Sequence, residues 1–125
     1  MTKVLEHKHI IIRAEVSEPI TRRNKAIKFL NRIIKAIGMK AMYGPTASYC
    51  KMNGNRGVTA FAIIETSHIA MHIWDEVNPA LVQLDVYTCG PFVPQSVLDI
   101  IQEIKPLKLE YKYVDREKAF TELPI

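Results

Sequence analysis

The chain has 125 residues, of which 48% are hydrophobic, so it is long enough for one domain with an ordinary core and too short for a separate cofactor domain. No apolar run approaches the roughly 20 residues of a membrane-spanning helix, and residues 1–9 lack the apolar core of a signal peptide, so we expect one cytoplasmic domain, residues 1–125. The formal charge of +4 is unevenly spread, because residues 1–56 carry 12 Lys and Arg against 3 Asp and Glu, while residues 57–125 carry 5 against 10.

The first predicted elements are a strand and a basic helix. His9 to Val16 is β-branched and apolar, which favours a strand. Ser17 to Pro19 is a helix-start signal, and apolar residues then recur at helical spacing as far as Gly38. The basic residues between them are Arg22, Arg23, Lys25, Lys28, Arg32 and Lys35. No series of aromatic residues accompanies them to stack on bases, so we interpret them as a solvated face and not as a nucleic-acid site.

The middle of the chain predicts three consecutive strands. Residues 39–56 show no clear pattern, and Asn53 to Gly57 is a strong turn signal. Val58 to Ile64 and His68 to Trp74 both have strand character, and Leu81 to Tyr87 follows as a third strand.

The end of the chain predicts a second helix and a last strand. Pro94 opens a helix with Val97, Ile101 and Ile104 on one face, and residues 107–113 alternate between apolar and charged side chains. Consecutive strands with so few helices predict an α+β fold, a two-layer α/β sandwich in which a mainly antiparallel sheet is covered by helices on one face.

Residues 65–90 contain the most informative motif. It reads S-H-I-A-M-H-I-W-D-E from Ser67 to Glu76 and D-V-Y-T-C-G from Asp85 to Gly90. The two segments resemble the signature of the small prokaryotic S-adenosylmethionine decarboxylases, approximately E-S-H-x-x-x-H-T-W-P-E followed by D-[VL]-[FY]-T-C-G, and the resemblance extends more weakly over residues 7–115. It implies a pyruvoyl-dependent decarboxylase that supplies the aminopropyl donor for spermidine and polyamine synthesis.

Decarboxylation of an amino acid leaves negative charge on its α carbon, and a cofactor must delocalise that charge because no side chain can. The resemblance implies a pyruvoyl group derived from Ser67. The serine hydroxyl attacks the preceding carbonyl, the amide becomes an ester, and elimination cuts the chain. We therefore expect self-cleavage between Thr66 and Ser67 into residues 1–66 and 67–125.

Two histidines follow the serine. His68 and His72 have the spacing of metal ligands on a helix, but the local alternation predicts a strand, in which four residues span roughly 13 Å, so we expect no metal site. The resemblance assigns to His72 the removal of the Ser67 α proton during self-cleavage. For His68 a structural role is preferred over a catalytic one.

Further roles are carried onto single residues by the resemblance. Cys89, one of two cysteines expected to be free thiols in a reducing compartment, would protonate the substrate carbon after CO2 leaves. Thr59 would supply a hydroxyl that assists the acyl shift, and Glu76 would bind ribose hydroxyls. The resemblance also implies pockets completed by a second subunit, so we expect a homodimer.

The chain departs from the family pattern at two informative positions. Thr66 stands where the family has a glutamate, and Asn53 stands where an aromatic residue would stack on the adenine of the substrate. Two alternatives therefore stay open. One is a pyruvoyl-dependent decarboxylase of a basic amino acid such as ornithine or arginine, and the other is an uncleaved, non-catalytic relative.

Overall fold

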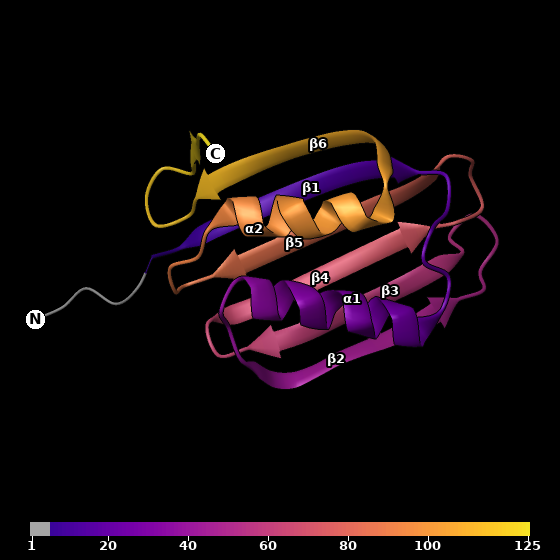
Figure 1. Cartoon of the computed structure of the whole chain (residues 1–125), viewed down its shortest axis with the longest axis horizontal. Helices are drawn as coiled ribbons and strands as arrows, with labels where there is room; N and C mark the ends of the chain where they lie inside the picture. Colours follow the sequence, from indigo (N-terminus) through magenta and orange to yellow (C-terminus); the bar gives the residue numbers. More distant parts are fainter. Residues whose placement is uncertain (1–5) are drawn as a thin grey trace, which may run out of the picture.

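The computed structural model describes residues 6–125, so residues 1–5 of the stretch considered above for a signal peptide lie outside the described residues. The chain forms one sheet and two α-helices on the same side of it (Figure 1). The strands are β1 (Lys8–Val16), β2 (Ala41–Cys50), β3 (Gly57–Ile64), β4 (Ser67–Trp74), β5 (Ala80–Thr88), β6 (Pro106–Asp115) and β7 (Thr121–Leu123). The helices are α1 (Arg23–Ala36) and α2 (Pro94–Ile101), the latter followed by the 3-10 helix η1 (Gln102–Ile104).

The sheet has seven strands in the order β2-β3-β4-β5-β1-β6-β7, and neighbouring strands pair antiparallel. Strand β1 is therefore inserted between β5 and β6, although it is first in the sequence. Helices α1 and α2 cover one face of the sheet, α1 over the β2 and β3 side (Figure 1). This arrangement confirms the predicted two-layer α/β sandwich with a mainly antiparallel sheet.

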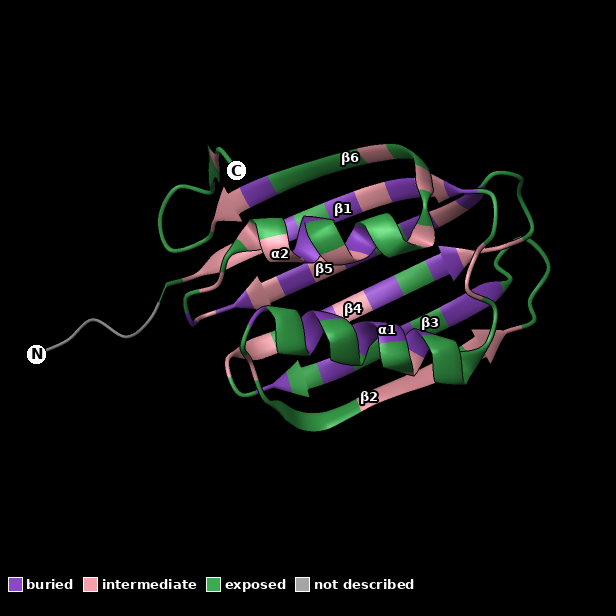
Figure 2. Cartoon of the chain, viewed as in Figure 1, coloured by how far each residue is buried: buried purple, intermediate pink, exposed green. Residues whose placement is uncertain are grey.

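Alternating burial along the strands places the core between the sheet and the helices (Figure 2). In β1, Ile10 and Ile12 are buried, whereas Ile11 between them is 47% exposed. Helix α1 buries Leu30 and Ile33, because its apolar residues recur at helical spacing along one face. Full burial of one such side chain contributes about 1.5–3 kcal/mol, so this face fixes which side of each strand points inward.

The opposite face of the sheet, named the open face below, carries neither α1 nor α2 (Figure 1). Alternate strand residues form it, and several of them are large and apolar. Ile11 of β1 is 47% exposed, and Phe61 and Ile63 of β3 are 40% and 44% exposed. A cluster of large apolar side chains on a sheet face is suited to contact with another protein layer.

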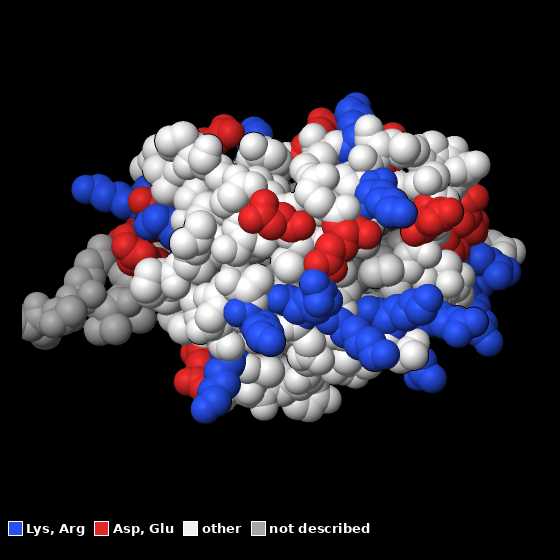
Figure 3. Space-filling model, in the orientation of Figure 1, with Lys and Arg blue, Asp and Glu red and all other residues white. Residues whose placement is uncertain are grey.

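Helix α1 begins at Arg23 and not at the predicted start signal, Ser17 to Pro19. Its cap residue, Arg22, is extended and makes no side-chain cap hydrogen bond. The first buried side chain of the helix is Ala26. The helix thus starts without a side-chain cap, and Lys and Arg side chains gather over its exposed side (Figure 3).

Two strands escaped prediction. Strand β2 has no alternating burial, since its first four residues are all exposed, and its pairing with β3 shifts register between Ala41 and Tyr43 and again between Tyr43 and Thr46. Strand β7 is only three residues long and pairs at the edge with β6.

Neither helix of the described chain is long and apolar enough to cross a membrane, and the cytoplasmic location stays a prediction.

Candidate active site

Ser67 is the first residue of β4, directly after the turn that leads out of β3. In the sheet it lies between Ile64 of β3 and Thr88 of β5. Its φ angle is 139°, a backbone conformation that residues with a side chain rarely adopt. Such strain costs on the order of 1–3 kcal/mol and persists only where the surrounding structure enforces it. The backbone of Ser67 is thus strained, and the pairing of β4 with β3 and β5 holds it in this conformation.

The carbonyl oxygen of Thr66 accepts a hydrogen bond of 2.7 Å from the backbone N–H of Cys89. This carbonyl is the one that the Ser67 hydroxyl would attack. During such an attack its oxygen gains negative charge, and a fixed N–H donor at that oxygen stabilises the charge. The peptide bond that is predicted to be cleaved therefore has a hydrogen-bond donor for the oxyanion. That donor is the backbone N–H of Cys89, whose thiol is the predicted proton donor after decarboxylation.

The chain packs tightly around this peptide. The Thr66 hydroxyl donates to the sulfur of Met39 at 3.0 Å, and a Cβ atom added to Gly90 would lie 2.9 Å from the Thr66 methyl group. The buried Thr88 hydroxyl donates to the Gly90 carbonyl. Glycine at position 90 thus allows the segment after β5 to approach the turn before β4, which brings the Cys89 N–H to its acceptor.

Thr59 and His72 lie far from Ser67, at the other end of β3 and β4. They face each other across the two strands, and Thr59 Oγ1 and His72 Nδ1 are 3.1 Å apart, within hydrogen-bond distance. The His72 ring stacks on Trp74 with 5.7 Å between ring centroids. His72 is five positions along the strand from Ser67, a span of roughly 16 Å. Within one chain, His72 therefore does not reach the α carbon of Ser67. The predicted strand that contains His72 is confirmed, and Ser67 is its first residue.

Glu76 lies beyond the end of β4 and is bound to the loop between β2 and β3. Its carboxylate accepts hydrogen bonds from the backbone N–H groups of Gly54 at 2.9 Å and Arg56 at 3.1 Å, and Arg56 Nε lies 3.6 Å away. A carboxylate has about four acceptor sites, so it can still accept from hydroxyl groups of a ligand. Asn53 accepts from the Arg56 guanidinium at 3.2 Å, so a polar side chain occupies the position expected for stacking.

Two tyrosines of β2, Tyr43 and Tyr49, are the aromatic residues to compare with the polar Asn53. The Tyr49 hydroxyl donates to Asp75 at 2.7 Å, and this hydrogen bond raises the pKa of Tyr49. Tyr43 stacks on Phe61, with 6.1 Å between ring centroids. The Tyr49 hydroxyl and the Tyr43 ring thus each have a partner within the chain.

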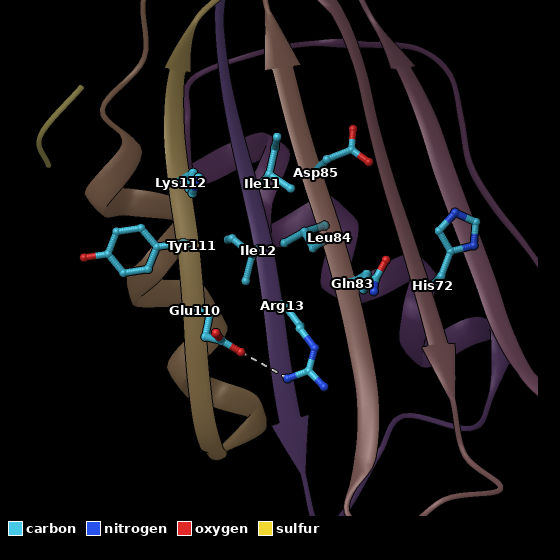
Figure 4. A pocket seen from close by; sticks show the side chains of 10 residues that line it. All are labelled: Ile11, Ile12, Arg13, His72, Gln83, Leu84, Asp85, Glu110, Tyr111 and Lys112. Atoms are coloured by element: carbon cyan, nitrogen blue, oxygen red, sulfur yellow. Dashed lines mark hydrogen bonds and ion pairs between the residues drawn. The ribbon is translucent and has the colours of Figure 1, made fainter. Parts of the chain in front are cut away.

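A hollow of about 430 Å³ on the open face lies over β1, β5 and β6, with His72 of β4 at its side (Figure 4). Its lining includes His72 of β4, Asp85 of β5 and Ile11 of β1. Arg13 also lines the hollow, and its guanidinium donates to Glu15 at 2.7 Å and to Glu110 at 3.2 Å. The hollow is open to one side, which makes it a surface on which a second protein layer could close.

Sequence reasoning missed one cluster on the open face. His68 Nδ1 lies 3.4 Å from the Ser67 hydroxyl oxygen, and His68 Nε2 lies 3.6 Å from the Asp85 carboxylate. His9 Nε2 approaches the same carboxylate at 3.2 Å. The His68 ring also contacts Tyr87, with 5.7 Å between centroids. Asp85 and Tyr87 belong to the second motif segment, but no sequence signal places them opposite His68, because strand register comes only with the fold.

No group of three or more His, Cys, Asp or Glu residues within 6–125 is arranged to hold a metal ion. Cys50 and Cys89 are free thiols, as predicted, and both are half-buried. Fold and site together define a small two-layer α/β protein with candidate reactive groups at both ends of one strand.

Comparison with known proteins identifies the family. The family model described as S-adenosylmethionine decarboxylase matches residues 8–117. The chain therefore belongs to the S-adenosylmethionine decarboxylase family, as the motif predicted.

Individual relatives agree with this assignment. The S-adenosylmethionine decarboxylase proenzyme of Pyrobaculum islandicum is 38% identical over 108 residues, covering 85% of this chain and 76% of that protein. The proenzyme of Pyrobaculum arsenaticum is 36% identical over 99 residues, covering 78% and 70%. The crystal structure of the adenosylmethionine decarboxylase from Aquifex aeolicus superposes with a TM-score of 0.69 at 23% identity, covering 98% of this chain and 100% of that one. This last similarity supports the fold.

Proposed function

We propose that this chain is a pyruvoyl-dependent S-adenosylmethionine decarboxylase, made as a one-domain proenzyme, whose product is the aminopropyl donor for spermidine synthesis. The observation that carries the proposal is the strained backbone of Ser67 together with the hydrogen bond from the Cys89 N–H to the Thr66 carbonyl. The relatives from Pyrobaculum are named decarboxylase proenzymes, which agrees with a chain that must be processed before it acts.

The residues around Ser67 fit the formation of a pyruvoyl group from the chain itself. Attack of the Ser67 hydroxyl on the Thr66 carbonyl converts the amide into an ester, and the Cys89 N–H stabilises the developing oxyanion. Loss of the Ser67 α proton then eliminates the Thr66 carboxylate and leaves a dehydroalanine. Water hydrolyses this residue, with release of ammonia, to the pyruvoyl end of residues 67–125. The pyruvoyl group supplies the electron sink that decarboxylation requires.

Cys89 and Glu76 have separate tasks in turnover. The Cys89 thiol donates a proton to the substrate carbon after CO2 has left, and its backbone places it beside the cleavage peptide. The Glu76 carboxylate binds the ribose hydroxyls, through acceptor sites that the loop amides of Gly54 and Arg56 leave free.

The active enzyme is a homodimer formed through the open face. Because His72 and Thr59 lie roughly 16 Å along the strand from Ser67, they reach that serine only from a second copy running in the opposite direction. The exposed Ile11, Phe61 and Ile63 on the open face provide apolar area for this contact. Each dimer then contains two sites, each combining the Ser67 end of one copy with the His72 end of the other.

The substrate assignment is tested by measuring CO2 release from carboxyl-labelled S-adenosylmethionine, ornithine and arginine with the same purified protein. We expect release from S-adenosylmethionine. Release from the free amino acids alone would favour the second candidate, a basic amino-acid decarboxylase, which the polar Asn53 at the stacking position supports. An intact, inactive chain after prolonged incubation would favour a non-catalytic relative.

The shared site is tested by mixing two inactive variants during expression, Ser67→Ala and His72→Ala. In a mixed dimer one site combines two wild-type ends and the other combines two altered ends. Random pairing makes half of the dimers mixed, so cleavage and decarboxylation should return to about one quarter of the wild-type amount. No recovery, from variants that form dimers, would contradict the shared site.

A further inference from the structure

The Ser67 hydroxyl needs a base before it can attack, and His72 of the same chain is too distant to serve. The side chain that meets this hydroxyl is His68, whose Nδ1 lies 3.4 Å from Ser67 Oγ. Catalytic hydrogen bonds are often long in a resting structure and tighten as the reaction proceeds. The side chain of His68 is 47% exposed, so its position on the open face is not explained by packing into the core.

Asp85 holds the His68 ring in the state that a base requires. The carboxylate lies 3.6 Å from His68 Nε2, which favours a proton on Nε2 and leaves the lone pair of Nδ1 directed at the Ser67 hydroxyl. His9 approaches the same carboxylate from β1 at 3.2 Å and limits its movement. The result is an arrangement of serine, histidine and aspartate in which a carboxylate orients a base toward a nucleophile.

We propose that His68 is the catalytic base of the first step of self-cleavage and that Asp85 is its positioning residue, an inference that rests on the processing proposed above. His68 Nδ1 takes the proton of the Ser67 hydroxyl while the oxygen forms a bond to the Thr66 carbonyl carbon. The C–N bond of the peptide then breaks, and the imidazolium returns the proton to the Ser67 nitrogen. The amide has become an ester, with no other reactant consumed.

This assignment divides proton transfer between two histidines. His68 handles the hydroxyl proton within its own chain, before the ester exists. His72 of the second copy handles the α proton after the ester exists. The two roles predict different stopping points, since loss of His68 blocks ester formation, whereas loss of His72 leaves the ester in place.

The central experiment follows the intact mass of freshly purified His68→Ala, His68→Gln and His72→Ala proteins beside the wild type. We expect cleavage of both His68 variants to slow by roughly 10²- to 10⁴-fold, the usual contribution of a general base. Hydroxylamine, which cleaves esters much faster than amides, should cut the His72 variant between residues 66 and 67 and leave the His68 variants intact. Added imidazole should partly restore cleavage of His68→Ala, which a merely structural histidine would not allow.

A positioning variant and a control make the test sharper. Asp85→Asn should slow cleavage by less than His68→Ala does, on the order of tenfold, because the base remains but loses its orientation. Asp99→Asn is the matched control, since it makes the same change at an exposed position on α2 and should be cleaved like the wild type.

The pH profile provides an independent readout. Cleavage by the wild type should depend on pH if His68 accepts the hydroxyl proton, and His68→Ala should lose this dependence. The charged and titratable groups around His68 are Asp85 and Tyr87 on β5 and His9 on β1, with the Arg116 guanidinium 4.0 Å over the Tyr87 ring. The Asp99→Asn control should retain the dependence.

The outcomes separate this inference from the proposed function. A wild-type chain that never cleaves would overturn both. A wild type that cleaves together with His68 variants that cleave at the same rate would overturn the role of His68 and leave the decarboxylase assignment standing. Hydroxylamine-sensitive ester in a His68 variant would have the same meaning, because it places His68 after the first step.

Discussion

The two ends of strand β4 are built for different tasks. At the Ser67 end the proposed chemistry combines main-chain features with the side chains of His68 and Asp85. The main-chain features are a φ angle of 139° and a hydrogen bond of 2.7 Å from the Cys89 amide to the Thr66 carbonyl. At the His72 end the chemistry depends on side chains, with the Thr59 hydroxyl 3.1 Å from the imidazole and the Glu76 carboxylate bound to loop amides. Strain and oxyanion donation need fixed main-chain geometry, whereas ligand binding needs chosen side chains. Because one chain holds the two ends roughly 16 Å apart, we propose that each site uses both ends, from two copies.

The largest effect is expected from Ser67→Ala, which removes the nucleophile and the source of the cofactor together. The chain should stay at its intact 14.3 kDa on a denaturing gel and release no CO2 from S-adenosylmethionine. Ser17→Ala, at an exposed position in the loop after β1, is the control and should be cleaved like the wild type. Cleaved fragments from Ser67→Ala would show that another residue is the nucleophile for self-cleavage.

Cys89→Ala separates the two uses of this residue, because it removes the thiol and keeps the backbone N–H. Self-cleavage should therefore continue, while kcat should fall by roughly 10²- to 10⁴-fold through loss of the proton donor. Protonation at the wrong carbon should also transaminate the cofactor and inactivate the enzyme during turnover. Cys50→Ala is the matched control. A cleaved Cys89→Ala protein with wild-type turnover and no inactivation would reduce this thiol to a packing role.

Glu76→Gln changes the proposed ribose-binding carboxylate and leaves the Thr66–Ser67 peptide bond unaltered. A hydrogen bond to a charged group contributes about 1.5–3 kcal/mol, so KM for S-adenosylmethionine should rise by roughly 10- to 150-fold. Cleavage should be unchanged, and thermal melting should report any loosening of the loop that Glu76 holds through Gly54 and Arg56. Glu122→Gln on β7 serves as control. An unchanged KM with a folded loop would remove Glu76 from the substrate site.

Asn53→Phe should give the smallest effect and in the opposite direction. Stacking on a base is worth about 1–3 kcal/mol, so an aromatic ring at this position should lower KM by part of a roughly 5- to 150-fold range. Loss of the Asn53 contact with Arg56 limits the gain. The measurement is KM for S-adenosylmethionine beside that for ornithine. An improved KM for ornithine instead would indicate that this end does not bind adenine.

Most of the fold could be predicted from the sequence, because strands buried on one face alternate and helix α1 repeats at helical spacing. Strand β2 could not, since its exposed start leaves no period to detect. The site residues came from the motif, which carries residue types and order. Their distances did not, because a separation of five positions between Ser67 and His72 has no fixed length until the segment is known to be a strand. His68 was assigned a structural role for the same reason, since its contact with Asp85 depends on the register of β4 and β5.

The strand order has a consequence for what self-cleavage leaves behind. Residues 1–66 contribute β1, β2 and β3, and residues 67–125 contribute β4 to β7, yet β1 is hydrogen-bonded on one side to β5 and on the other to β6. Strands β3 and β4 remain paired as well. The two fragments are thus joined by three strand pairings, β1 with β5, β1 with β6 and β3 with β4. Cutting one peptide bond at the turn before β4 releases a chain end, but it does not release a fragment. The mature protein would behave as a permanently associated pair, in which the only new freedom belongs to the residue that begins the second piece.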